Sequence, residues 1–323
     1  MTPPAVEARS LSRSFGTRVA LSDVTFAVPR GEVFALLGPN GGGKTTLFRI
    51  LATLLPPGAG SFSIDGLDAG QHARAVRKRL GVVFQSPSLD KKLTVRENLA
   101  LQGALYSLSR LLLAKRIGEL LATFGLEDRG KDLVETLSGG LARRVEIAKA
   151  LLHAPPVLLL DEPSTGLDPG ARRDLVGLLG ALAREGTAVL LTTHLFEEAE
   201  AAHRIGILDR GRLLALDAPA ALKATLGGDV VSVETKDESG APALAAAIGS
   251  RFGQEAGRVT VVGSTVRVER GAAHTFVPRL VEAFPGAFKS VTLGAPSLED
   301  VFIARTGRLF READGADSGS GAA

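Results

Sequence analysis

The chain of 323 residues is 45% hydrophobic and 23% charged, a composition typical of folded proteins that bury two or three cores rather than of disordered chains. Its net charge of +3, from 38 basic and 35 acidic residues, lacks the strong positive bias of a nucleic-acid binder, so we expect no nucleic acid as a partner. The absence of cysteine excludes disulfides and thiolate metal sites, so we expect any metal to be oxygen-bound, such as Mg²⁺.

The first ten residues, MTPPAVEARS, contain neither the basic nor the apolar segment of a signal peptide, so we expect the protein to stay in the cytoplasm. The most apolar long stretch, 99–114, is interrupted by polar residues and is shorter than the ~20 apolar residues of a membrane-spanning helix. We therefore expect no transmembrane helix. Residues 6–37 alternate in short segments that predict an antiparallel sheet, where Phe15 could stack on adenine or, as is more common, belong to the core.

Residues 38–46 read GPNGGGKTT and satisfy the pattern G-x-x-x-x-G-K-[ST] directly after the apolar run 33–37. Glycines let successive backbone N–H groups turn toward a phosphate chain, and a helix that begins near Lys44 directs its positive end at the same anion. We predict that Lys44 binds the β- and γ-phosphates and that Thr45 binds Mg²⁺. The predicted nucleotide-binding residues of this loop are Gly38, Pro39, Asn40, Gly41, Gly42, Gly43, Lys44, Thr45 and Thr46.

A second apolar run, 80–84, ends in Gln85, which could ligate Mg²⁺, orient water, or be an ordinary polar loop residue. From 86 to about 154 the apolar spacing is helical and predicts an insertion between two halves of a nucleotide-binding sheet. Its third helix starts at LSGG, 137–140, with Ser138 as the N-cap. The start of that helix is either a second anion-binding site or an ordinary capped helix.

The run VLLLD at 157–161 is typical of a central parallel strand that is buried on both faces. Asp161 ends this strand and Glu162 follows it. We predict that Asp161 ligates Mg²⁺ and that Glu162 polarises the hydrolytic water. His194 follows the next strand, 187–192, which would bring it close to the phosphates, although a lone histidine is more often exposed and unimportant.

The order of apolar segments changes after residue 228. Residues 229–308 give the order βαββαβ, which predicts a small α+β ferredoxin-like domain. This domain lacks a cluster of titratable residues that resembles a catalytic site, so we expect a role in contact or regulation. Residues 309–323 are small and polar and are predicted to be a disordered tail.

Taken together, GPNGGGKTT, Gln85, LSGG, VLLLDEP, the STGLD of 164–168 and His194 resemble the ATP-binding subunit of ABC transporters. The resemblance implies an α/β fold: a P-loop (RecA-like) ABC ATPase core over 1–228, with an antiparallel β subdomain and a helical subdomain at about 86–154. It implies ATP and Mg²⁺ as cofactors. It also implies a homodimer that holds ATP between the P-loop of one copy and the LSGG signature of the other.

The same resemblance assigns roles to individual residues. Glu162 is the catalytic base, His194 is the switch and Gln85 belongs to the Q-loop, where it serves both catalysis and the metal. Asp161 is the Walker B carboxylate that joins Thr45 on Mg²⁺. The signature and the D-loop contribute Ser138, Gly139, Gly140 and Asp168. The sequence departs from the family in two places, with Leu141 where Gln is common and Phe15 where Tyr is common.

Two further segments, SLDKKLTVRENL at 88–99 and APSLEDVFIARTGR at 295–308, are similar to the daunorubicin-resistance type of ABC-2 exporter ATPase. This similarity implies an ABC-2 type membrane permease as partner and a peripheral position at the cytoplasmic face of the membrane. It also implies export of a drug-like or other hydrophobic compound. The alternatives are an importer subunit and a soluble ABC ATPase that acts on nucleic acid or the ribosome. The soluble alternative is disfavoured because the chain carries one cassette and no long coiled coil before Asp161.

Overall fold

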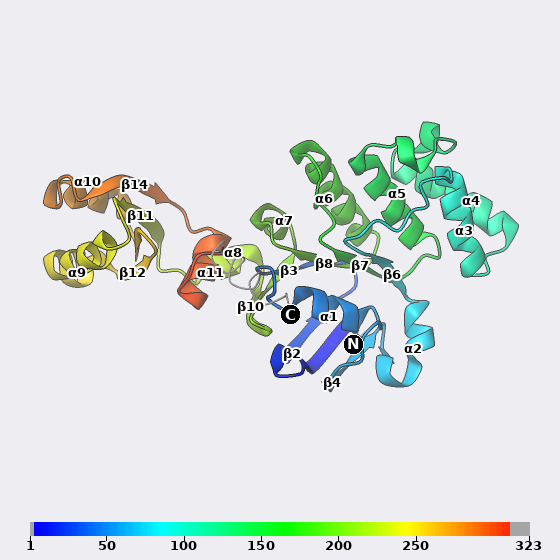
Figure 1. The fold of residues 1–323 in the computed structure, drawn as a ribbon, viewed down its shortest axis with the longest axis horizontal. Coiled ribbons are helices and arrows are strands. Elements are labelled where there is room, and N and C mark those ends of the chain that lie inside the picture. Colours follow the sequence, from blue (N-terminus) through cyan, green and yellow to red (C-terminus); the bar gives the residue numbers. More distant parts are fainter. Residues whose placement is uncertain (1–2, 311–323) are drawn as a thin grey trace. The chain divides into compact units, whose positions relative to one another are not determined.

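The computed structural model describes residues 3–310 (Figure 1). The contacts divide the chain after Leu216 into two compact units, the first holding the elements from β1 to β10 and the second those from α8 onward. Within the described residues, no helix is long and apolar enough to cross a membrane, as expected. Most of the predicted tail, 311–323, lies outside the described residues. Phe310 does not: it is buried, and its ring packs edge-on against Phe302.

The first unit is built on a six-stranded sheet in the order β10-β9-β3-β8-β7-β6. From β9 to β6 neighbouring strands are parallel, and every residue of β3, β7 and β8 is buried. Continuous apolar runs form these strands because helices cover both faces of the sheet. The strands are β3 Val33–Leu37, β6 Leu80–Val83, β7 Val157–Asp161, β8 Ala188–Thr193, β9 Arg204–Asp209 and β10 Arg212–Asp217.

Helices follow the carboxyl ends of these strands, so the loops that carry chemistry meet at one edge. Helix α1, Lys44–Leu51, follows β3 and lies on one face of the sheet, whereas α6, Pro169–Arg184, and α7, Phe196–Glu200, lie on the other face (Figure 1). The face with α1 shares its core with a second, antiparallel sheet in the order β2-β1-β4-β5. Those elements are β1 Val6–Phe15, β2 Arg18–Val28, β4 Ala59–Ile64, β5 Leu67–Asp68 and the adjoining helix α2 Ala69–Arg77.

The predicted helical insertion is present between β6 and β7. Thr94 and Glu97 form a reciprocal capping box that starts α3, and Ser109 caps α4. The elements are α3 Val95–Leu105, α4 Arg110–Thr123, two short 3₁₀ turns, η1 Glu127–Arg129 and η2 Val134–Thr136, and α5 Gly139–Leu151. Three helices with apolar residues three and four apart thus occur where the periodicity predicts them.

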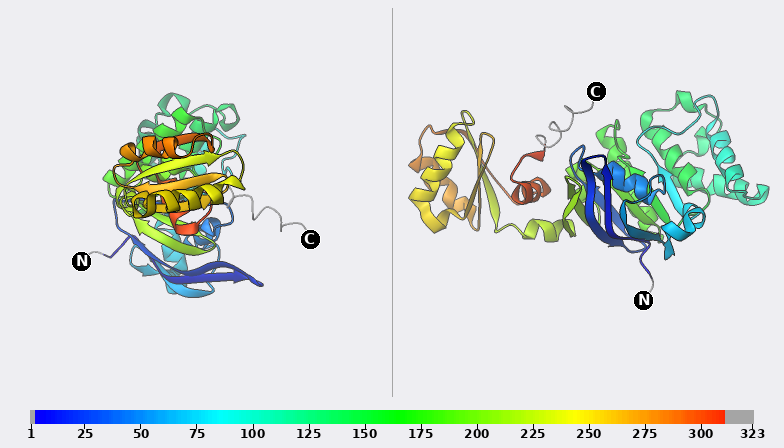
Figure 2. Two further views of the ribbon diagram at one scale, coloured as in Figure 1. Left: turned by 90° about the vertical axis from the view of Figure 1, so that its left-hand side faces the viewer. Right: turned by 60° about the horizontal axis from the view of Figure 1, so that its bottom comes forward.

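The second unit has the predicted order βαββαβ, and its sheet runs β12-β13-β11-β14 with all neighbours antiparallel. Helices α9 and α10 cover one face of this sheet, as Figure 2 shows, and share its core. This is the ferredoxin-like arrangement that the sequence predicts. Its elements are β11 Asp229–Thr235, α9 Gly240–Phe252, η3 Gly253–Ala256, β12 Arg258–Val262, β13 Thr265–Arg270, α10 Ala273–Ala283 and β14 Phe288–Gly294, flanked by α8 Pro219–Ala224 and α11 Leu298–Thr306.

Candidate active site

The glycine-rich loop leaves β3 at Gly38 and ends at Gly43, the N-cap of α1. Gly43 has φ +106°, a left-handed conformation, and a Cβ added there would lie 2.7 Å from the carbonyl oxygen of Ala20. A residue with a side chain therefore fits neither the backbone angle nor the space. The first turn of α1 contains no acidic residue, and no side chain caps it. The partial positive charge of this helix end is thus left to a ligand.

Lys44 lies at the start of α1, and its side chain is only 4% exposed. Its Nζ donates a hydrogen bond to the carbonyl oxygen of Gly38 at 2.6 Å and lies 3.8 Å from Oε1 of Glu162. A buried ammonium needs such partners, because burial without them destabilises the charged form. Lys44, predicted to bind the phosphates, and Glu162, predicted to polarise the water, therefore lie close together.

Asp161 is buried at the end of β7, where its Oδ1 accepts a hydrogen bond of 2.5 Å from the Thr192 hydroxyl of β8. Burial raises the pKa of the Asp161 carboxyl above its ordinary value, and the adjacent Glu162 carboxylate acts in the same direction. The Thr192 hydroxyl and the Lys44 ammonium oppose this rise. A carboxylate held in this way has a second oxygen available for a cation.

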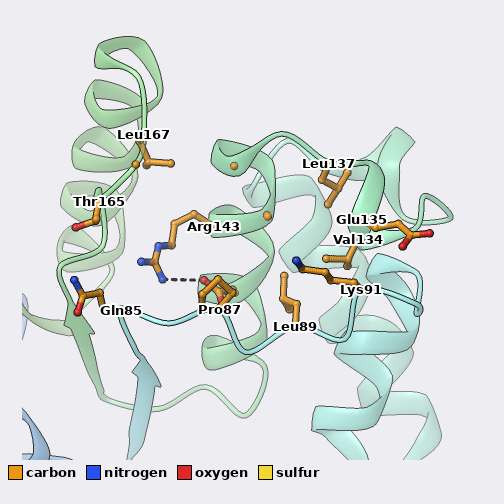
Figure 3. Close-up of a pocket in the computed structure, with 14 residues that line it drawn as sticks. Gln85, Pro87, Leu89, Lys91, Val134, Glu135, Leu137, Arg143, Thr165 and Leu167 are labelled. Atoms are coloured by element: carbon orange, nitrogen blue, oxygen red, sulfur yellow. Dashed lines mark hydrogen bonds and ion pairs between the residues drawn. The ribbon is translucent and has the colours of Figure 1, made fainter.

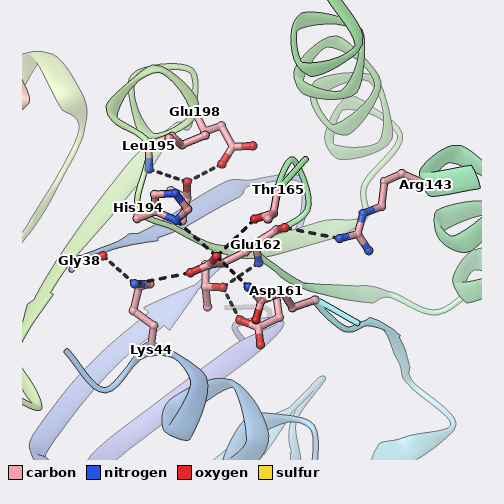
Figure 4. Close-up of polar contacts among 12 residues, drawn as sticks. Gly38, Lys44, Arg143, Asp161, Glu162, Thr165, His194, Leu195 and Glu198 are labelled. Carbon is pink, nitrogen blue, oxygen red and sulfur yellow. Dashed lines mark hydrogen bonds and ion pairs between the residues drawn. The ribbon is translucent and has the colours of Figure 1, made fainter. Parts of the chain in front are cut away.

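Glu162 is the hub of the site (Figure 4). Its Oε2 accepts hydrogen bonds from Gln85 Nε2 at 3.2 Å and from Thr165 Oγ1 at 3.3 Å, and His194 Nδ1 lies 3.3 Å away. The close contact with His194 lowers the pKa of Glu162 below its ordinary value, with further contributions from Lys44 and Thr165, while burial opposes them. Glu162 is therefore ionised at neutral pH and can accept a proton.

The backbone at Glu162 has φ +45°, an uncommon value for a residue with a side chain. Its N–H is fixed by the carbonyl oxygen of Thr192 at 3.2 Å and by that residue's hydroxyl at 3.0 Å. Strained backbone held in place by neighbours is common at catalytic positions. Thr193, the residue directly before His194, positions that histidine. Its Oγ1 donates to Glu198 and accepts from the N–H of Leu195 at 2.9 Å.

Sequence reasoning missed Arg143, which lies in α5 and is buried. Its guanidinium donates to the main-chain oxygens of Phe84, Glu162 and Pro163, at 2.9, 3.4 and 2.8 Å. It also forms an ion pair of 2.8 Å with Glu146. The opposite charges of Arg143 and Glu146, three residues apart on the helix, are the sequence signal that could have pointed to this contact.

The predicted signature and D-loop residues lie at two helix starts. Ser138 caps α5 through the N–H of Leu141, as predicted, and Gly139 begins that helix. Asp168 caps α6, accepting from the N–H groups of Gly170 and Ala171 at 2.9 and 3.0 Å. These hydrogen bonds lie within their own loops. Their predicted role in contacting the nucleotide of a second copy stays a prediction.

A pocket of about 520 Å³ lies between the segment after β6, the start of α5 and the loop after Glu162 (Figure 3). Gln85 and Arg143 line it, and Pro87, Leu89 and Leu137 give it apolar walls. Phe15 lies at the end of β1, 46% exposed, with the Arg13 guanidinium 5.1 Å from its ring centroid. An exposed aromatic ring fits the predicted adenine contact, which stays a prediction.

The oxygens near Lys44 fit a Mg²⁺ ion that arrives with a nucleotide. In the described part of the chain no group of three or more His, Cys, Asp or Glu side chains could hold a metal unaided. Mg²⁺ usually needs only one or two protein oxygens when phosphates complete its coordination. The carboxylate of Asp161, with the hydroxyl of Thr45 in the first turn of α1, is such a donor set.

Comparison with known proteins identifies the family that shares these features. A sequence profile described as ABC transporter matches residues 21–165. The daunorubicin resistance ATP-binding protein DrrA3 of Streptomyces coeruleorubidus is 38% identical, over 97% of this chain and 100% of its own length. The linearmycin resistance ATP-binding protein LnrL of Bacillus subtilis (strain 168) is 33% identical, over 95% of this chain and 100% of its own length.

Two solved structures share the fold of the first unit. An ATP-binding subunit of an ABC transporter is 33% identical with a TM-score of 0.62, covering 68% of this chain and 92% of its own. The ATP-binding cassette MJ0796, solved as a dimer in a post-hydrolysis state with ADP and Pi, is 29% identical with a TM-score of 0.59, covering 66% of this chain and 98% of its own. With the sheet, the glycine-rich loop and the carboxylates arranged as described, this chain belongs to the ABC transporter family, as an ATP-binding subunit that hydrolyses ATP.

Proposed function

We propose that the chain hydrolyses Mg-ATP at this site to drive export of a drug-like or other hydrophobic compound through a separate membrane permease. The observation that carries the proposal is the meeting of Lys44, Glu162, Gln85 and His194 at the carboxyl ends of four strands. The relatives named for daunorubicin and linearmycin resistance, similar over nearly the whole chain, support export rather than import.

In this proposal the side chains divide the work of binding and hydrolysis among them. Lys44 and the N–H groups at the start of α1 bind the β- and γ-phosphates. Thr45, Asp161 and Gln85 hold Mg²⁺, which when bound neutralises charge on the phosphates. Glu162, kept ionised by His194 and Lys44, accepts a proton from the attacking water. His194 orients Glu162 through the contact at 3.3 Å.

A second copy completes the site in this proposal. The start of α5, residues Ser138, Gly139 and Gly140, carries no acidic residue in its first turn, so it can receive the γ-phosphate bound by the P-loop of the other copy. The dimeric cassette among the similar structures supports such a pairing. ATP would then hold two copies together until it is hydrolysed.

The partner that we propose is an ABC-2 type permease, which would hold the chain at the cytoplasmic face of the membrane. The segment after Gln85 is the proposed contact, because Gln85 touches Glu162 and Pro87, Leu89 and Lys91 line the pocket with it. The sequence suggests Leu89 and Leu93 as exposed contact residues. In the structure both are half-buried, because the segment pairs with residues 133–135 through bonds such as that from the N–H of Val134 to the carbonyl oxygen of Leu93, 3.1 Å.

The test is drug transport into inside-out membrane vesicles that contain this chain and its permease, with ATP hydrolysis measured in parallel. Uptake into inverted vesicles that requires ATP supports export, and ATP-driven loss of drug from them would overturn it. Leu89→Ala should lower transport while basal hydrolysis persists. Leu105→Ala, a leucine 73% exposed at the end of α3, is the matched control and should leave transport unchanged. Equal transport in both variants would discard the segment after Gln85 as the contact.

A further inference from the structure

Arg143 joins three segments that are far apart in the sequence. From α5 its Nη1 donates to the carbonyl oxygen of Phe84, the residue directly before Gln85. Its Nε donates to Pro163 and its Nη2 to Glu162, so the guanidinium holds the main chain on which the Glu162 carboxylate stands. Figure 4 shows this approach from the side of α5. One planar group thus spans both loops that bring Gln85 and Glu162 together.

Glu146, one turn further along α5, strengthens the connection. Its Oε2 accepts from Arg143 at 2.8 Å, and its Oε1 accepts from the N–H of Ser88 at 2.6 Å. Lys149, the next turn of the helix, donates to the carbonyl oxygen of Ser88 at 2.7 Å. The segment after β6 is therefore tied to α5 at Phe84 and again at Ser88, on either side of Gln85.

Both members of the Arg143–Glu146 pair are buried, with side chains 8% and 6% exposed. An ion pair so shielded from water is a weak source of stability, because desolvation offsets most of its attraction. Its value lies in geometry: a guanidinium fixes the directions of all its hydrogen bonds at once, which a flexible ammonium cannot do. The pair is therefore better explained by positioning than by stabilisation of the fold.

We propose that Arg143 is a positioning residue for ATP hydrolysis, which couples the placement of Glu162 and Gln85 to α5, the helix that Ser138 caps. The inference rests on the proposed function, in which Glu162 accepts the proton of the attacking water. Movement of α5 then moves the reacting carboxylate and the Q-loop with it. A nucleotide contact at Gly139, the first residue of α5, thereby affects the position of Glu162 through four residues of helix and the guanidinium of Arg143.

The experiment compares steady-state ATP hydrolysis, affinity for a non-hydrolysable ATP analogue and thermal unfolding for Arg143→Met and for the double variant Arg143→Met, Glu146→Leu. The double variant matters because Arg143→Met alone leaves a buried, unpaired Glu146, whereas replacing both charges with apolar groups is often neutral for stability. Since small misplacements in an active site cost up to about 100-fold, we expect kcat to fall by about 10- to 100-fold. KM and analogue affinity should stay close to those of the native chain.

Arg144→Met is the matched control, because Arg144 follows on the same helix but pairs with the exposed Asp174 at 2.7 Å. It should retain native kcat. A folded double variant with native kcat would overturn the proposal, and so would an equal loss of kcat and analogue affinity, which indicates general damage to the site. Glu162→Gln distinguishes the proposed function from the positioning role of Arg143. An inactive Glu162→Gln variant supports the proposed function independently of Arg143, whereas full activity would overturn both the function and the positioning role.

Discussion

Gly38→Ala tests whether the close contact between β3 and β9 positions the phosphate-binding loop. A Cβ at Gly38 would lie 2.1 Å from the carbonyl oxygen of Leu208 and 3.2 Å from its carbonyl carbon. These atoms are backbone in the buried part of β9, so they cannot rotate away as the end of a side chain can. β3 must move relative to β9 by about 1 Å, and overpacking of this kind typically costs about 1–3 kcal/mol.

The same movement displaces the oxygen that accepts the hydrogen bond of Lys44, 2.6 Å from its Nζ. We therefore expect Gly38→Ala to lose both stability and nucleotide affinity, with the melting temperature falling by about 2–4 °C for each kcal/mol. The assays are calorimetric unfolding and titration with an ATP analogue.

Gly118→Ala makes the same chemical change at a position where the structure predicts a gain of stability instead of a loss. Gly118 is exposed inside α4, and a Cβ added there would meet nothing within 4 Å. Because alanine favours a helix interior over glycine, this variant should gain about 0.5–1 kcal/mol of stability and bind nucleotide normally. If Gly38→Ala melted and bound the analogue like the native chain, the argument from the Leu208 contact would be refuted.

Two further substitutions separate binding from chemistry at the same site. Lys44→Ala removes the buried cation next to Gly38. Because hydrogen bonds to charged groups contribute about 1.5–3 kcal/mol, we expect analogue affinity to fall by about 10- to 150-fold and hydrolysis to cease. Unchanged turnover would contradict the assignment of Lys44 to the phosphates. Glu162→Gln keeps the shape of the side chain but removes the proton acceptor, so hydrolysis should fall by about 10²- to 10⁴-fold while analogue binding persists. In the presence of ATP this variant should accumulate as a closed dimer. Size-exclusion chromatography with ATP that shows only monomer would contradict the dimer.

The central sheet and its functional edge could be predicted because the signals are local. An unbroken apolar run such as that of β7 fits only a strand covered on both faces, and parallel strands bring their carboxyl ends to one edge. Residues near the carboxyl ends of such strands, like Gln85 and Glu162, are therefore expected at one edge of the sheet, and the structure places Gln85 Nε2 3.2 Å from Glu162 Oε2. The capping residue Ser138 can likewise be identified by chemistry confined to one helical turn.

Arg143 could not be predicted in the same way, because its partners are main-chain oxygens of Phe84, Glu162 and Pro163. Every residue has such an oxygen, so no pattern of side chains marks these three. Apolar periodicity by itself assigns Leu141 to the buried face of α5, yet Leu141 is half-buried and Arg143 is buried. Burial of the charged residue is stabilised by tertiary hydrogen bonds that periodicity does not register.

The adjacent carboxylates Asp161 and Glu162 illustrate how environment assigns different roles to similar side chains. Burial raises the pKa of Asp161, whereas the close contact with His194 lowers the pKa of Glu162. The sequence orders the two residues but does not contain these opposite shifts, since they depend on Thr192, His194 and Lys44. Opposed environments for neighbouring acids commonly separate their functions.

His194→Ala should expose this dependence as a change with pH. Removing the largest cause of the lowered pKa leaves burial, which raises it, opposed by Lys44 and Thr165, so the pKa of Glu162 should rise. The acid limb of kcat/KM reports groups of the free enzyme and should therefore move to higher pH.

The stability that ionised Glu162 contributes is present above its ordinary pKa of 4.5 and lost as pH falls through the lowered value, so acid unfolding should also begin at higher pH in the variant. His72→Ala, at an exposed histidine of α2, is the control and should leave both profiles in place. An acid limb that stays where it is in His194→Ala, with only its height reduced, would show that His194 acts on the reaction without setting the charge of Glu162.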